Sequence, residues 1–132
     1  MGMDVYGLNP TAQVGKLFCI SHHGWSLLAT LCKTFAPEES KLCQHWYSND
    51  GDGLNAEQSA RLAQRLEAAL GDGSIDRLRE YLERAEELGV RARLEYLQSV
   101  GCAMFAHYDA TDPYLVAEFL EFLRTCGGFV IR

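Results

Sequence analysis

The sequence predicts an all-α or nearly all-α fold, in which about six helices form one compact, antiparallel-type bundle over residues 1–132. Three observations predict it. Most apolar residues recur at intervals of three and four, which is the period of one helix face. Glycine clusters and capping residues separate these stretches by short connections. The length of 132 residues and the hydrophobic content of 48% are typical of a single globular domain.

Residues 1–17 are predicted to be an extended N-terminal arm of this helical domain. Gly7 and the Asn9-Pro10 pair favour turns and interrupt any helical period. Met3 is an alternative natural start, which would make residues 1–2 a cloning remnant.

Two helices should follow the arm. Ser21 is a suitable N-cap for a helix that ends near Phe35. Because positions 24–35 are apolar nearly all round, this helix should lie at the centre of the core. Pro37 favours the first turn of a second, short helix that runs to about Tyr47.

A glycine- and aspartate-rich segment at 48–53 should break the helical pattern before the next two helices. Asn55 and Gln58 form a capping-box pattern at the start of the first of these helices. Ser74 is a suitable N-cap for the second helix, which should end at Gly89. Their apolar stripes are Leu62, Ala63, Leu66, Ala69 and Leu70, and Ile75, Leu78, Leu82, Ala85 and Leu88.

The last part of the chain predicts two more helices and a short strand. The final helix should begin at Asp112-Pro113 and stop at Gly127-Gly128. Residues 129–131 form a strand-like run, which would pair with the N-terminal arm. The helix that precedes the final helix carries an apolar stripe made of Val90, Leu94, Leu97, Gly101, Met104 and Tyr108.

Charge and composition narrow the function classes. The net charge is −6, and each third of the chain contributes −2, so a dominant nucleic-acid role is not expected. No stretch has the roughly 18 apolar residues of a membrane span. Without a secretory leader, and with an odd cysteine count that argues against disulfides, the cytoplasm is the expected location. The five cysteines, expected to be reduced thiols, are Cys19, Cys32, Cys43, Cys102 and Cys126.

The polar segment around 45–53 is the strongest candidate for a functional surface. It fits a calcium loop poorly, since Ser48 and Ser59 stand where the ion needs Asp and a bidentate Glu. A structural turn and a polar interaction loop both remain open. The candidate binding residues are His45, Tyr47, Asn49, Asp50 and Asp52, with Trp25 and Tyr6 alongside if the arm packs there.

Metal and catalytic patterns are weak. Cys19 and His22 have the spacing of a zinc-ligand pair, whereas Cys43 and His45 do not. No nucleophile elbow, zinc-protease helix or phosphate-binding loop is present. We therefore expect no cofactor and no bound metal, and we favour a protein that is not an enzyme.

Three short motifs resemble a family of small uncharacterised bacterial and phage-associated proteins. These motifs are Asp4-Val5-Tyr6-Gly7-Leu8-Asn9-Pro10, Ser48-Asn49-Asp50-Gly51-Asp52-Gly53-Leu54 and Cys126-Gly127-Gly128-Phe129. They match the family's Val-Tyr-Gly-x-Asn-Pro opening, Asn-Asp-Gly loop and Gly-Gly-Phe ending. The resemblance implies a stand-alone domain and carries no activity with it.

Three functional hypotheses follow from the sequence. The first is a cytoplasmic accessory or interaction domain that binds a protein partner or itself. The second is a metal-dependent enzyme or metal-binding protein centred on residues 45–52. The third is an acidic immunity-type or phage-associated inhibitor that blocks a basic partner, for which the low pI of about 5.1 is typical.

Overall fold

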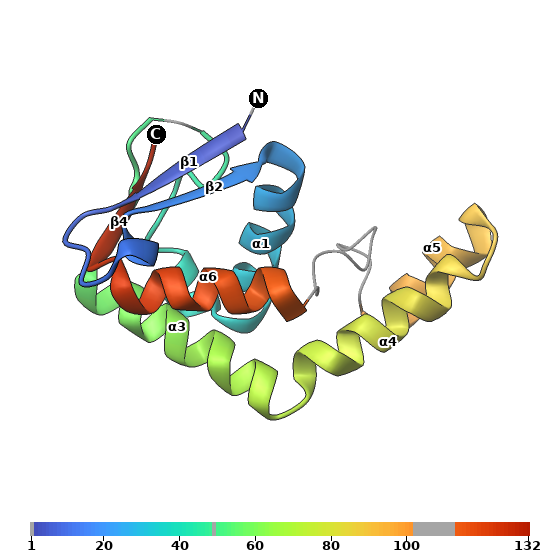
Figure 1. The fold of residues 1–132 in the computed structure, drawn as a ribbon. Helices are drawn as coiled ribbons and strands as arrows, with labels where there is room; N and C mark the ends of the chain where they lie inside the picture. The colour runs from blue at the N-terminus through green and yellow to red at the C-terminus, as the bar shows by residue number, and fades with distance from the viewer. Residues whose placement is uncertain (1, 49, 102–112) are drawn as a thin grey trace.

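The computed structural model describes residues 2–48, 50–101 and 113–132, and in these ranges the fold is mixed α/β (Figure 1). The predicted all-α bundle is therefore wrong. The helices are α1 (His22–Phe35), α2 (Pro37–Ser40), α3 (Ala56–Gly71), α4 (Ser74–Glu86), α5 (Val90–Ser99) and α6 (Pro113–Thr125), with a short 3₁₀ turn, η1 (Gln13–Gly15). The strands are β1 (Gly2–Gly7), β2 (Leu17–Ser21), β3 (Gly53–Asn55) and β4 (Gly128–Ile131).

The four strands form one antiparallel sheet in the order β2-β1-β4-β3. Val5 of β1 lies opposite Ile131 of β4, which confirms the predicted pairing of the C-terminal run with the N-terminal segment. The N-terminal segment also pairs with the strand that follows it, since β1 lies antiparallel to β2 from Gly2 to Tyr6. The sheet thus joins both ends of the chain.

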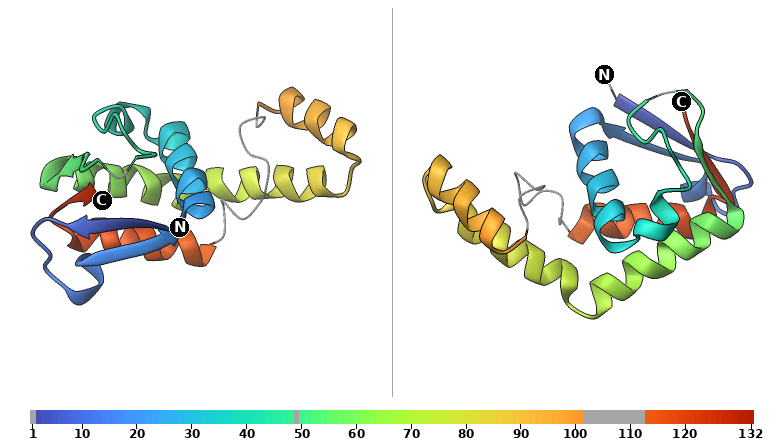
Figure 2. Two further views of the ribbon diagram at one scale, coloured as in Figure 1. Left: turned by 90° about the horizontal axis from the view of Figure 1, so that it is seen from above. Right: turned by 180° about the vertical axis from the view of Figure 1, so that it is seen from behind.

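The described helices lie on one face of this sheet, on which α1 and α6 contact β2 and α3 contacts β4 (Figure 2). Strand side chains alternate between the two faces, so every second residue points into the core. The buried strand residues are Met3, Val5, Phe18, Leu54, Phe129 and Ile131. As expected from its composition, α1 lies in the core, where it buries Trp25, Leu27, Leu28, Ala29, Leu31 and Cys32.

Two predicted caps are confirmed. The Ser21 hydroxyl accepts a hydrogen bond from the backbone N–H of Gly24 at 3.1 Å. Asn55 and Gln58 form the reciprocal capping box, in which each side chain accepts from the other residue's backbone N–H. These bonds satisfy helix-end donors, so α1 and α3 begin where the sequence predicts.

Two other helix ends differ from the expectation. The second helix stops at Ser40 instead of continuing to Tyr47, because the backbone beyond it tightens into turns in which the Leu42 and Cys43 N–H groups donate to the carbonyls of Glu39 and Ser40. The buried Trp46 indole N–H also donates to the Ser40 carbonyl, at 2.9 Å. Ser74 is the first residue of α4 rather than its cap. The N-cap is Gly73, and the Ser74 N–H donates to the Asp72 carboxylate at 2.8 Å.

The pair α4 and α5 projects away from the sheet as an arm (Figures 1 and 2). Leu97 is buried, but Val90 and Leu94 are exposed, so the predicted apolar stripe of this segment is only partly in the core. The rest of that stripe beyond Gly101, and the predicted helix start at Asp112, lie outside the described residues.

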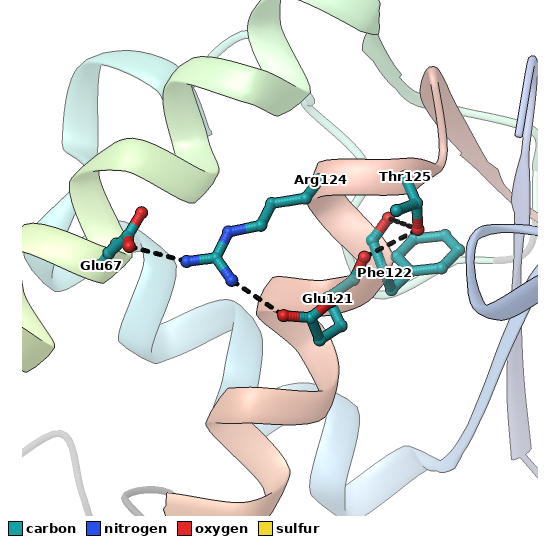
Figure 3. Close-up of polar contacts among 5 residues, drawn as sticks. All are labelled: Glu67, Glu121, Phe122, Arg124 and Thr125. Atoms are coloured by element: carbon teal, nitrogen blue, oxygen red, sulfur yellow. Dashed lines mark hydrogen bonds and ion pairs between the residues drawn. The ribbon is translucent and has the colours of Figure 1, made fainter. Parts of the chain in front are cut away.

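An arginine links two of the helices beneath the sheet. Arg124 of α6 makes 2.8 Å ion pairs with Glu67 of α3 and with Glu121 of its own helix (Figure 3). The Thr125 hydroxyl donates to the Glu121 carbonyl at 2.7 Å. Because the guanidinium is well exposed, each pair contributes less than about 1 kcal/mol, and the core residues carry most of the stability.

Candidate binding surface

Asp52, the last of the predicted loop residues, holds its own loop together. One carboxylate oxygen accepts the backbone N–H groups of Gln44 and His45 at 2.8 and 2.9 Å, and the other accepts that of Gly53 at 2.9 Å. These bonds hold the pKa of the Asp52 carboxyl below its ordinary value, and the bond from the His45 N–H has the largest effect. Burial acts in the opposite direction and raises the pKa. Asp52 therefore fixes the chain before β3.

The rest of the predicted loop forms a local turn. The Ser48 hydroxyl donates to the Asp50 carboxylate at 2.8 Å, and Gly51 adopts a positive φ of 89° that suits glycine. The backbone N–H of Gly51 donates to the Ile131 carbonyl at 2.9 Å, which places the turn against β4. Asn49 lies outside the described residues.

Trp25, another predicted binding residue, belongs to the core. Its side chain is 1% exposed, and its indole N–H donates to the Trp46 carbonyl. The two rings lie 5.6 Å apart, and Trp46 also packs on Phe129 of β4 at 6.0 Å. Trp25 thus anchors residues 41–47 to the helical layer, and a partner would not reach it in the folded protein.

Tyr47 lies beside a surface hollow. The Lys33 ammonium donates to its hydroxyl at 3.1 Å and stands 4.3 Å from its ring centroid. The hollow has a volume of about 380 Å³, and its lining includes Lys33, Ser40, Lys41, Cys43 and Trp46. His45 is exposed nearby, with its backbone N–H committed to Asp52. Both side chains are accessible to a partner.

Thiol and metal chemistry gain no support in the described ranges, where no group of three His, Cys, Asp or Glu side chains could hold a metal ion. Burial raises the pKa of the Cys32 and Cys126 thiols, and with the Asp52 charge it raises the pKa of Cys43 to about 12. These thiols stay protonated at neutral pH and are poor nucleophiles or ligands. No described helix is long and apolar enough to cross a membrane.

Tyr6, the remaining predicted residue, lies on the face of the sheet opposite the described helices. It is 40% exposed and stands between Leu17 of β2 and Val130 of β4 in one cross-strand row. Leu17 is itself 43% exposed. Gly53, next to the Asp52 turn, lies opposite Val130 on the other side, so this row connects Tyr6 with the end of the predicted loop.

The β2 end of the row is a sheet edge with unpaired backbone groups. The Gly7 N–H donates to the Lys16 carbonyl at 3.0 Å, and hydrogen-bonded pairs of an antiparallel ladder recur every second residue, here at Phe18 and Ile20. The residues between them turn their backbone groups away from β1, and among the described strands β2 pairs with β1 alone. These outward residues are Leu17, Cys19 and Ser21.

The two edges of the sheet differ in how they are protected. The β3 edge is three residues long, and the Asp52 carboxylate covers it by binding the Gly53 N–H and the 44–45 segment. The β2 edge is five residues long and contains no charged residue, no proline and no glycine. Natural sheets usually blunt such an edge, so an open one indicates a pairing site.

We call Tyr6, Leu17, Cys19 and Val130 the open-edge surface. Of these, only Tyr6 was among the predicted site residues. The signal for Leu17 and Cys19 is the alternation of buried and outward residues in 17–21, and for Val130 it is the strand-like run at 129–131. Both runs are too short to stand out beside the helical periods. Comparison of the chain with protein-family models, curated proteins and solved structures finds no match, so the family resemblance stays a prediction.

Proposed function

We propose that the protein is a cytoplasmic accessory domain that binds a protein partner by adding a strand of that partner to the β2 edge. The observation that supports the proposal is the open, uncharged β2 edge beside the exposed Leu17 and Tyr6. In strand addition, main-chain hydrogen bonds supply affinity and alternate side chains supply specificity.

The chemistry of the edge defines the partner segment. Each new backbone hydrogen bond contributes about 0.5–1.5 kcal/mol, so the outward groups of three residues support only moderate affinity. Leu17 and Tyr6 would contact the partner side chains that lie on the outer face, and these should be apolar. A suitable partner is therefore an extended segment with apolar residues at alternate positions.

A substitution that blocks the edge without disturbing the sheet tests the proposal. The N–H of Cys19 points away from β1, so Cys19→Pro removes an outward donor and leaves the β1–β2 ladder in place. Cys19→Ala is the matched control, because it keeps the donor. Melting curves should show both variants folded.

Extended peptides selected from a random display library would be titrated against all three proteins. We expect wild type and Cys19→Ala to bind equally and Cys19→Pro to bind at least about tenfold more weakly. Backbone N-methylation of the peptide at alternate positions should have the same effect. Equal binding by Cys19→Pro, or loss of binding on Tyr47→Ala alone, would overturn the proposal in favour of the 45–53 loop.

A further inference from the structure

We infer that the strand added to β2 is the β2 strand of a second copy of this chain, so that two four-stranded sheets join into one across a two-fold axis at Cys19. This inference rests on the proposed function of the β2 edge. Two copies would meet through the same surface, as in most closed dimers.

The backbone favours this register. With the axis at Cys19, the two Cys19 residues lie opposite each other, and their outward N–H and C=O groups form a hydrogen-bonded pair. Leu17 then lies opposite Ser21 of the other copy. Because Ser21 is the N-cap of α1, its carbonyl accepts the first hydrogen bond of that helix. Ser21 therefore contributes only its N–H, which donates to the Leu17 carbonyl.

The structure at the two ends of β2 excludes an axis on either of the other two outward residues, Leu17 and Ser21. An axis at Leu17 would set Cys19 against Gly15, whose position next to the Thr125 backbone is so close that not even a Cβ fits there. An axis at Ser21 would bring together the first turns of the two α1 helices. Cys19 is thus the one outward residue of β2 with free strand on both sides.

The side chains are complementary in the same register. On the core face, Phe18 lies opposite Ile20 of the other copy, and both residues already pack against the core. Such an aromatic–β-branched pair contributes about 0.2–1 kcal/mol, and the two-fold axis makes the Phe18–Ile20 pair occur twice. On the outer face, the large Leu17 lies opposite the small Ser21, and two small Cys19 side chains face each other.

Charge also permits a second copy. Although each chain carries −6, β2 has no charged residue, and its nearest charges are Lys16 before the strand and Asp4 on β1. Like charges are therefore not set opposite each other in the ladder. Five residues on each side form a small interface, so we expect a weak dimer with a dissociation constant of about 1–100 μM. Because no charged pair holds this interface together, added salt should not dissociate the dimer.

Charge substitutions at the axis test the inference directly. Cys19→Lys would place two ammonium groups opposite each other, and Cys19→Glu two carboxylates, whereas an equimolar mixture would place opposite charges there. Sedimentation velocity from about 1 μM to about 1 mM should show that wild type and Cys19→Ala form dimers. The dimer dissociation constant of each charged variant should be at least about tenfold higher, and the equimolar mixture of the two should dimerise again. Melting curves of the variants check that they fold.

The outcomes separate this inference from the proposed function. A wild type that stays monomeric to about 1 mM, or a dimer that neither charged variant weakens, would overturn the second-copy inference. Peptide binding that depends on the Cys19 N–H could survive either result. If no extended peptide binds at Cys19, but mixing the two charged variants restores the dimer, the β2 edge accepts only the β2 strand of a second copy.

Discussion

Replacing Asp52 by asparagine tests whether this residue is a structural clamp. The carboxylate accepts three backbone N–H groups at 2.8–2.9 Å from its two oxygens. The amide keeps one neutral acceptor and turns an NH₂ group toward the remaining donors. A hydrogen bond to a charged group contributes about 1.5–3 kcal/mol, and solvent access reduces the total for this partly buried side chain, so we expect a loss of about 2 kcal/mol.

The assay is thermal and urea unfolding of wild type and variant at several pH values. For 132 residues, a loss of about 2 kcal/mol corresponds to a Tm lower by about 7 °C. Because the folded-state pKa of Asp52 lies below its ordinary value, its contribution is present above the unfolded pKa and is lost as the pH falls through the folded one. The difference between the two proteins should therefore shrink as the pH falls below the ordinary aspartate pKa of 3.8.

Asp50→Asn is the matched control, since the exposed Asp50 carboxylate accepts a hydrogen bond from the Ser48 hydroxyl alone among the described residues. This variant should change stability by less than about 0.5 kcal/mol. Equal losses for Asp50→Asn and Asp52→Asn, or an Asp52→Asn loss that does not change with pH, would refute the clamp.

Four further predictions concern other parts of the molecule. Gly127→Ala should cost more than about 2 kcal/mol in urea unfolding, because φ is +64° and the new Cβ would lie 2.2 Å from a backbone oxygen. Gly71→Ala, at the end of α3 with open space around it, should instead stabilise by about 0.5–1 kcal/mol. Asp4→Asn should speed alkylation of Cys19 at pH 8, followed by peptide mass spectrometry, because a hydrogen bond to Asp4 is the main cause that raises the pKa of this thiol. Trp46→Phe should lower stability by about 1–3 kcal/mol in the same unfolding assay, because the buried indole is replaced by a smaller ring and the Ser40 carbonyl keeps only the Cys43 N–H of its two donors.

The helices could be predicted from the sequence far better than the sheet. Ser21 and the Asn55–Gln58 pair act within one turn of chain, so the residues that decide a helix start are adjacent in sequence. The sheet depends instead on contacts between the two ends of the chain, such as Val5 with Ile131. Strands of three to six residues show too few periods to stand out, and none would be stable without its distant partners.

A binding site is hard to predict from composition, because unusual composition marks a tight turn as readily as it marks function. Asp52 and Gly51 are needed to turn the chain and to cover the β3 edge, which explains much of the polar loop by folding alone. Trp25 is needed by the core, and Tyr6 is the predicted residue that the structure leaves on the sheet face opposite the described helices.

The contrast between the two sheet edges is the strongest argument for where a partner binds. Both edges belong to the same four-stranded sheet, and a turn and the Asp52 carboxylate cover the three-residue edge at β3. The longer edge at β2 carries Leu17 and Cys19 in the open and has no charge to repel another strand. An unprotected edge of this kind invites non-specific pairing unless a specific strand occupies it. Occupation by the same strand of a second copy would protect both molecules at once, which is why we place the binding function at β2.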